Sequence, residues 1–304
     1  MWFESATVRT VRDTFPEWTA FVWAFFSYFG SVWFVAPAVV LALYVGSRER
    51  FGPWLGTVMG GYALMVGTKG YFAVDRPDVG LTIEPASLPI GLRHVYAPLV
   101  EVSSTSFPSG HAMAGTVVWA MLALELDVGT RRQRLIGAAA MVLAICVARV
   151  AVGLHFPIDV VVGVALAAGF VGGILALRRV VRDRYDRHAE TSAVFAAVAV
   201  VSIAAFVVGG RVDAVALFGA TIGGLLAWTC ATPPTDAPPL SPDRLVYWLV
   251  GLSLLAACAL VLLMTDWVLA WFGVGLFTGA VIVGLPRFVE GTVEPTTLGQ
   301  VAEN

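Results

Sequence analysis

Three clusters of polar residues interrupt a chain that is otherwise strongly apolar. In chain order they are Lys69 with Arg76-Pro77, then Phe107-Pro108-Ser109-Gly110-His111, and then Arg149 with His155 and Asp159. Their side chains are of the types that bind anions and move protons. Ionisable groups near membrane depth are costly to bury, so clusters of this kind indicate function.

The cations of these clusters favour a phosphate group as the ligand. Lys69, Arg76 and Arg149 together neutralise a dianion. The guanidinium fork of arginine matches two phosphate oxygens at once, which a point charge does not. The residue types therefore predict a phosphate site.

The second cluster predicts an anion cradle at the start of a helix. Pro108 suits the first turn, where its missing N–H costs nothing. The amides of Ser109, Gly110 and His111 then point out of the helix end, where free N–H groups and the helix dipole bind anions. Gly110 allows close approach of the backbone, and the Ser109 hydroxyl adds a donor.

The third cluster predicts an imidazole that is oriented by a carboxylate. Pro157 begins another helix, so that His155 and Asp159, four residues apart, lie on one side of its first turn. A carboxylate at one imidazole nitrogen fixes the tautomer and raises the basicity of the other nitrogen, as in hydrolase triads. The carboxylates of the chain are too few and too scattered to hold a water-activating metal. We therefore predict a site without metal or cofactor.

The composition places these clusters in an integral membrane protein. Hydrophobic residues make up 58% of the 304-residue chain and charged residues 13%, and the mean hydropathy is +0.82. Soluble domains carry about a quarter charged residues, so this chain has too few charges to cover a surface that faces water. The formal net charge of −2 excludes the basic footprint of a nucleic-acid-binding protein.

Apolar runs long enough to cross the hydrocarbon layer predict an all-α, polytopic membrane bundle of about nine transmembrane helices. The runs are Ala20–Val45, Trp54–Phe72, Pro108–Leu126, Leu135–Val152, Pro157–Leu177, Ala193–Gly209, Ala214–Ala231, Leu245–Met264 and Trp267–Leu285. Aromatic residues at the start of the first run suit the membrane interface, and the crossing itself is then expected to begin near Gly30.

Alternation of the spans brings the three clusters to one membrane surface. The second and fourth spans end on the face where the third and fifth begin. Twelve of the 19 basic residues fall on the opposite face and seven on this one. Because cytoplasmic loops are enriched in Lys and Arg, we predict a plasma-membrane protein whose active site faces outward. The long loop Asp78–Phe107 on that face is the expected cover of the site.

The chain divides into three parts. Residues 1–19 are predicted to be an interfacial N-terminal extension, 20–188 a core of five spans that holds the three clusters, and 189–304 an accessory region of four spans with a short tail. The later spans carry almost no polar residues. Pairs of small residues predict close helix packing, and they are Gly56/Gly60, Gly169/Gly173, Gly219/Gly223 and Gly275/Gly279.

The clusters resemble the three signature motifs of the type 2 phosphatidic acid phosphatase superfamily, a group of membrane lipid phosphatases and their relatives. The resemblance covers roughly residues 20–177, with Ala148 where the third motif usually has a serine. It implies that His155 is the nucleophile and forms a phosphohistidine, that Asp159 orients it, and that His111 protonates the leaving group. The residues that it implies for binding the phosphoryl oxygens are Lys69, Arg76, Ser109, Gly110 and Arg149.

The resemblance implies metal-independent hydrolysis of a lipid phosphate or diphosphate, with the lipid substrate and membrane lipids as partners. Candidate substrates are polyprenyl (dolichyl-type) diphosphates, a phosphatidylglycerophosphate-like lipid and phosphatidic acid. One alternative is a phosphotransferase, in which a hydroxyl group replaces water in the second step. Another is a transporter or flippase, although the later spans lack the buried charges and broken helices of transport sites.

Overall fold

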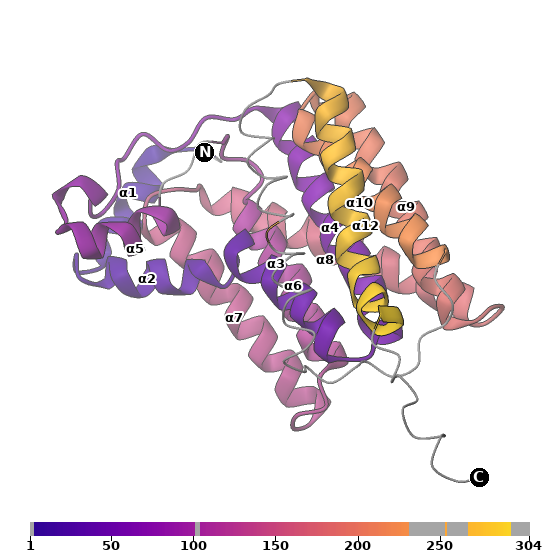
Figure 1. Cartoon of the computed structure of the whole chain (residues 1–304). Coiled ribbons are helices and arrows are strands. Elements are labelled where there is room, and N and C mark those ends of the chain that lie inside the picture. Colours follow the sequence, from indigo (N-terminus) through magenta and orange to yellow (C-terminus); the bar gives the residue numbers. More distant parts are fainter. Residues whose placement is uncertain (1–2, 101–103, 231–252, 254–266, 293–304) are drawn as a thin grey trace, which may run out of the picture.

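The computed structural model of the chain describes residues 3–100, 104–230, 253 and 267–292, and every regular element among them is helical (Figure 1). The elements are α1 (Ser5–Thr14), α2 (Thr19–Tyr28), α3 (Val32–Val45), α4 (Arg48–Phe72), the 3-10 turn η1 (Pro85–Ser87), α5 (Ile90–Val100), α6 (Gly110–Glu125), α7 (Arg131–Ala151), α8 (Pro157–Arg182), α9 (Arg187–Gly209), α10 (Val212–Thr229) and α12 (Val268–Thr292). The predicted all-α fold is confirmed for these residues.

Six segments of the described chain are long and apolar enough to cross a membrane, which supports a membrane protein but not the predicted count of nine. They are Thr19–Val45, Arg131–Ala151, Pro157–Arg182, Arg187–Gly209, Val212–Thr229 and Val268–Leu285. The predicted second and third spans correspond to α4 and α6, which are not among the six. α6 has only 16 residues, whereas about 20 are needed to cross the hydrocarbon. The predicted span Leu245–Met264 lies outside the described residues.

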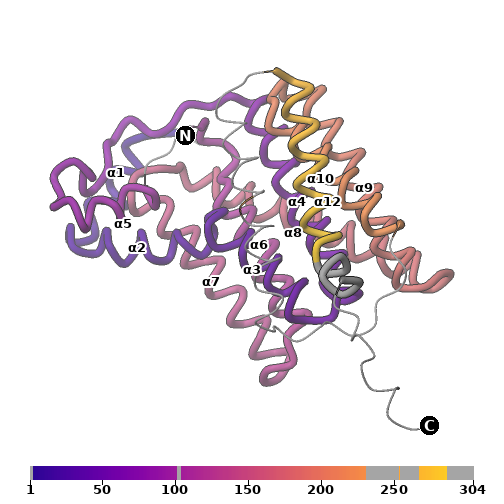
Figure 2. The backbone as a smooth tube through the Cα atoms, viewed as in Figure 1, coloured from indigo at the N-terminus to yellow at the C-terminus, as the bar shows by residue number. Residues whose placement is uncertain are grey.

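The first predicted span consists of two helices. α2 ends at Tyr28 and α3 begins at Val32, and the chain changes direction between them (Figure 2). The turn between the two helices packs directly against the start of α6. A Cβ atom on Gly30 would therefore lie 2.6 Å from the carbonyl oxygen of His111. α2 packs on α5 and α7, so the aromatic start of the run covers one end of the bundle.

α4 is the central helix of the bundle. It contacts α3, α6, α8, α9 and α10, and most of its residues are buried. Trp54, Leu55 and Val58 of α4 belong to one hydrophobic core with residues of the surrounding helices. Near the other end of α4, a Cβ atom on Gly67 would lie 2.7 Å from the Cα atom of Ala205 in α9. The two backbones therefore nearly touch where α4 approaches its last turn.

Glycines join α10 and α12 along a seam of close backbone contact. Gly219 and Gly223 of α10 face α12, and Gly275 and Gly279 of α12 face α10. A Cβ atom on any of the four would lie between 1.9 and 2.2 Å from a backbone oxygen of the other helix. The two helices run side by side in Figures 1 and 2, as small residues at this spacing predict.

The pair Gly169/Gly173 of α8 does not pack as predicted. No described atom lies within 4 Å of a Cβ placed on either residue, because this face of α8 turns away from the other described helices. The pair Gly56/Gly60 of α4 does pack, against side chains of α8 and α9. The spacing alone does not distinguish the two cases.

A buried ion cluster joins α8 and α9 at the end of the bundle opposite the predicted site. Glu190 of α9 is 1% exposed and lies 2.5 Å from Nε of Arg178 and 2.7 Å from Nη2 of Arg182. Arg178 also lies 3.5 Å from Glu125 at the end of α6. Because removing one partner leaves a buried charge less well compensated, the contact of α9 with α8 at this end depends on every member of the cluster.

Candidate active site

One cavity collects residues from all three clusters. It has a volume of about 240 Å³ and is lined by Lys69 near the end of α4, Arg76 in the loop that follows, Gly110 and His111 at the start of α6, and His155 in the turn between α7 and α8. The segments meet because α4 and α7 end on the side where α6 and α8 begin. This is the arrangement that alternation of the helices predicts.

His155 is oriented by Asp159. Pro157 is the first residue of α8, and the Asp159 carboxylate in the first turn accepts a hydrogen bond from the amide of Phe156 at 2.9 Å. The same carboxylate oxygen lies 3.1 Å from Nδ1 of His155. The two residues are 1% and 0% exposed, so water does not compete for this contact. When Nδ1–H donates to Asp159, the lone pair of the imidazole is on Nε2.

Ser106 is a further member of this group, and the motif spacing does not indicate it. Its hydroxyl donates to the same Oδ2 atom of Asp159 and lies 3.4 Å from Nδ1 of His155. Its amide donates to the carbonyl oxygen of Val74 at 2.7 Å, and the residue is fully buried. A serine just before Phe107 looks like an ordinary loop residue until its contact with α8 is known.

Arg76 connects the loop before α6 with the histidine. Its Nε donates to the carbonyl oxygen of Ser104 at 2.8 Å, and its Nη1 donates to that of Leu154 at 2.7 Å. Nη1 also lies 3.2 Å from Nε2 of His155. Burial lowers the pKa of Arg76 to about 10, which leaves the guanidinium charged at neutral pH. An anion that reaches Nε2 therefore meets a positive charge beside it.

His155 is held in its neutral form. Burial lowers its pKa well below the usual value, and the positive charges of Arg149, Arg76 and Lys69 lower it further. Each effect disfavours the imidazolium, because a buried charge loses hydration and like charges repel. A neutral imidazole at neutral pH is the form that attacks an electrophile.

Lys69 and Arg149 supply the other two cations of the site. Nζ of Lys69 donates to the carbonyl oxygens of Thr105 and, at 3.4 Å, Ser106. Arg149, in the last turn of α7, is fully buried and donates Nη1 to the carbonyl oxygen of Leu99 at 3.2 Å. Its Nε and Nη2 have no hydrogen-bond partner within the described chain. Arg149 does not line the cavity, although its charge reaches His155.

Ser109 and Pro108 do not lie in the first turn of the helix, where the sequence predicts them. α6 begins at Gly110, Ser109 is its N-cap, and Pro108 precedes the helix, with a cis Phe107–Pro108 peptide bond. The Ser109 hydroxyl accepts from the amide of Ala112 at 3.5 Å, and the Ser109 amide donates to the carbonyl oxygen of Asp159 at 3.0 Å. Ser109 thus joins α6 to α8 and does not line the cavity, whereas Gly110 and His111 do.

The arrangement combines the groups that phosphoryl transfer requires. A neutral imidazole, oriented by a carboxylate, lies beside a guanidinium, and a second histidine and a lysine line the same cavity. Fixed positive charges stabilise a phosphoryl group in its transition state because they need no reorganisation when negative charge develops. Among the residues described, no group of three His, Cys, Asp or Glu side chains is placed to hold a metal ion.

Comparison with known families supports a class of activity for the stretch that holds this site. Residues 50–183 match the sequence profile of the PAP2 superfamily, and they include all three clusters. This stretch of the chain belongs to the PAP2 superfamily. The resemblance seen in the motifs is thereby confirmed, and membership in PAP2 supports a phosphatase or phosphotransferase activity. Neither the curated proteins nor the solved structures that were compared with the chain gave a match.

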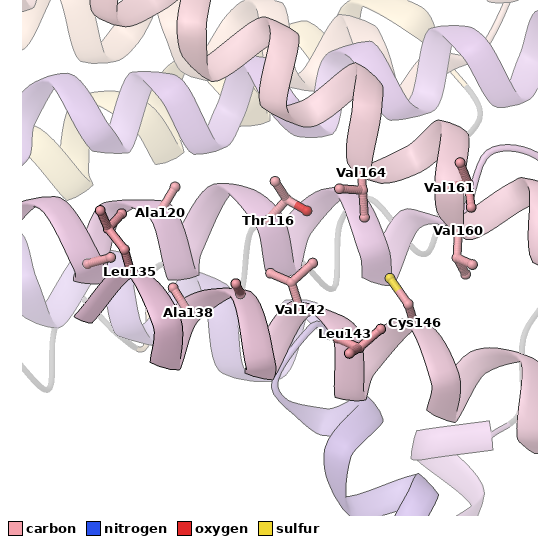
Figure 3. A pocket seen from close by; sticks show the side chains of 12 residues that line it. Thr116, Ala120, Leu135, Ala138, Val142, Leu143, Cys146, Val160, Val161 and Val164 are labelled. Carbon is pink, nitrogen blue, oxygen red and sulfur yellow. The ribbon is translucent and has the colours of Figure 1, made fainter. Parts of the chain in front are cut away.

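A larger cavity in the PAP2 region is apolar and lies apart from these groups. It has a volume of about 560 Å³ and opens between α7 and the helices α6 and α8 (Figure 3). Leu135, Val142 and Leu143 line it from α7, and Val164 lines it from α8. The hydroxyl of Thr116, in α6, donates to a carbonyl oxygen of its own helix at 2.7 Å. This cavity therefore offers contact to hydrocarbon, while the two histidines, Lys69 and Arg76 line the smaller one.

Proposed function

We propose that the protein hydrolyses a phosphate or diphosphate group on a membrane lipid through a phosphohistidine intermediate. One observation carries this proposal: the cavity that holds Lys69, Arg76 and the two histidines is also lined by Val32, Met65 and Val66. An amphiphile fits such a cavity, because its phosphate meets the cations while its first carbons meet the apolar wall. Polyprenyl diphosphates, a phosphatidylglycerophosphate-like lipid and phosphatidic acid all have this character.

In the first step, Nε2 of His155 attacks the phosphorus of the substrate. The imidazole lone pair forms the N–P bond, the P–O bond to the leaving group breaks, and the electron pair stays on the leaving oxygen. His111 gives this oxygen a proton. Lys69, Arg76 and Arg149 offset the negative charge of the phosphoryl group, with the amide of Gly110 as a further donor and Ser109 holding the start of α6.

In the second step, water attacks the phosphohistidine. His111, which has lost its proton in the first step, takes a proton from the water as the new O–P bond forms. The N–P bond breaks and its electron pair returns to His155, so inorganic phosphate leaves and the enzyme is restored. A lipid or sugar hydroxyl in place of water would make the protein a phosphotransferase. Product analysis with added acceptor alcohols distinguishes the two activities.

The experiment that tests the proposal measures phosphate release from a panel of lipid phosphates and diphosphates by the purified protein. Activity is expected to persist in EDTA and to be inhibited by vanadate, which takes the geometry of a phosphoryl group in transfer. His155→Ala is expected to abolish turnover. His111→Ala is expected to slow hydrolysis most for substrates with alkoxide leaving groups. Wild-type turnover by His155→Ala, or an activity lost in EDTA and restored by magnesium, would contradict the mechanism.

We further propose that the cavity opens to the outside of the plasma membrane. The distribution of basic residues supports this orientation, since cytoplasmic loops are enriched in Lys and Arg. Ser87 in η1 and Gln133 in α7 are both exposed, and the proposed orientation assigns them to opposite sides of the membrane. Ser87→Cys is expected to react with an impermeant thiol reagent in intact cells, and Gln133→Cys only after lysis. The reverse pattern would overturn the orientation and leave the phosphatase chemistry untouched.

A further inference from the structure

Two charged residues outside the PAP2 motifs line the same cavity as the histidines. Arg211 and Asp213 lie at the connection between α9 and α10, beyond residue 183, where the family match ends. They come from the accessory region, in which the sequence predicts almost no polar chemistry. The cavity is therefore completed by helices that do not belong to the matched stretch.

Close packing of α4 and α9 places this connection at the cavity. A Cβ atom on Gly70 would lie 2.2 Å from the carbonyl oxygen of Gly209, and one on Gly209 would lie 2.6 Å from that of Gly67. Gly210 then ends α9 with φ of +65°, a left-handed conformation that glycine adopts without strain. Gly70 directly follows Lys69, so this turn is held beside the lysine of the first motif.

Arg211 and Asp213 form a partly exposed ion pair in the lining of the cavity. Nη2 and Nε of Arg211 lie 2.6 Å and 3.1 Å from Oδ2 of Asp213. The two side chains are 42% and 35% exposed, and an ion pair exposed to this degree contributes little to stability. Replacing the Asp213 carboxylate with a phosphate as the partner of Arg211 therefore costs little free energy. The positive charges of Arg211 and Lys69 also interact, and an anion between them relieves their repulsion.

We infer that Arg211 binds the phosphate group that is not transferred, and that the preferred substrates of this cavity are lipid diphosphates. The inference rests on the proposed function and adds the substrate class to it. Arg76 lies within 3.2 Å of the attacking nitrogen of His155 and thus serves the terminal phosphate. Arg211 lines the same cavity at the start of α10 and is partly exposed, so we assign the lipid-bound phosphate to it. Its fork holds two oxygens of that group.

The bond that breaks in such a substrate joins the terminal phosphorus to the bridging oxygen. His155 forms the N–P bond, the bridging oxygen keeps the electron pair, and a lipid monophosphate leaves. Negative charge grows on the leaving phosphate as the bond breaks, so Arg211 stabilises the transition state more than the bound substrate. A lipid monophosphate has no group at this position, and its hydrolysis is independent of Arg211.

The test compares the diphosphate and the monophosphate of one polyprenyl alcohol as substrates for the purified full-length protein. Arg211→Gln is expected to lower kcat/KM for the diphosphate about tenfold, as loss of one hydrogen bond to a charged group does. Its kcat/KM for the monophosphate is expected to change less than about threefold. Arg132→Gln removes an exposed arginine at the start of α7 that does not line the cavity, and it is expected to leave both values unchanged.

A second measurement does not depend on turnover. Binding of inorganic pyrophosphate and of inorganic phosphate to the purified protein is measured by calorimetry, and Arg211→Gln is expected to weaken pyrophosphate binding selectively. The inference is overturned if Arg211→Gln lowers kcat/KM equally for both lipids and weakens the binding of both anions equally. The proposed phosphatase activity would not be affected by that result. If the wild type hydrolyses neither lipid, the proposed function fails, and the pyrophosphate measurement decides the role of Arg211 by itself. A folding defect is recognised by a lowered melting temperature.

Discussion

Asp159→Asn removes the charge that orients His155 and keeps the shape of the side chain. In the structure one carboxylate oxygen accepts from Nδ1 of His155 at 3.1 Å, from the amide of Phe156 at 2.9 Å and from the hydroxyl of Ser106. The asparagine keeps one carbonyl oxygen for the helix start and for Ser106, so the fold is expected to persist. What is lost is the negative charge that stabilises the imidazole as it becomes cationic during attack.

The expected size of the effect follows from the burial of the pair. The side chains of His155 and Asp159 are 2% and 0% exposed, so solvent does not screen their interaction. A hydrogen bond to a charged group is worth about 1.5 to 3 kcal/mol, and about 1.4 kcal/mol corresponds to a tenfold change in rate. We therefore expect kcat to fall about 10- to 100-fold. KM is expected to change little, because Asp159 does not line the cavity.

The assay is single-turnover formation of the phosphoenzyme from a lipid phosphate that the wild type hydrolyses, followed by quenching and detection of acid-labile, base-stable phosphate. Asp183→Asn, at the exposed end of the same helix, is the matched control and is expected to behave as wild type. The melting temperature is measured for both variants. A correctly folded Asp159→Asn protein with wild-type kcat would refute the orienting role of the carboxylate.

Three further predictions concern pH, helix packing and the buried ion cluster. Burial and nearby cations lower the pKa of His155, so the imidazole stays neutral as the pH falls through 6.5, the usual pKa of histidine. The acid-side fall of kcat/KM is therefore expected below pH 6.5. A fall that begins above this pH would contradict the assignment of His155. Gly223→Ala places a Cβ atom 1.9 Å from a backbone oxygen of α12 and is expected to cost about 1 to 3 kcal/mol of stability, whereas Gly169→Ala, which has open space, is expected to be neutral in thermal unfolding. Glu190→Gln removes one of the two carboxylates beside the buried Arg178 and leaves Glu125 at 3.5 Å, so it is expected to cost less than about 3 kcal/mol. An unchanged melting temperature would show that Glu125 alone is a sufficient partner.

Much of the PAP2 site could be predicted from the sequence because its determinants are local. His155 and Asp159 are four residues apart across a helix start marked by Pro157, so the helix itself brings them together. Lys69 and His111 meet because α4 ends on the side where α6 begins, and the order of the apolar runs predicts that alternation of helix direction. The residue types then favour a phosphate group as the ligand.

Tertiary structure decided the parts that depend on contacts between distant segments. The Ser106 hydroxyl donates to the Asp159 carboxylate, and the Ser109 amide donates to the carbonyl oxygen of Asp159 in α8. Both hydrogen bonds depend on packing that no local pattern encodes. Equal spacing of small residues leaves Gly169 open but packs Gly223 tightly. Arg211 reaches the cavity because α4 and α9 touch backbone to backbone. Spacing determines which residues share one helix face, whereas the close fit of two surfaces determines which face meets which neighbour.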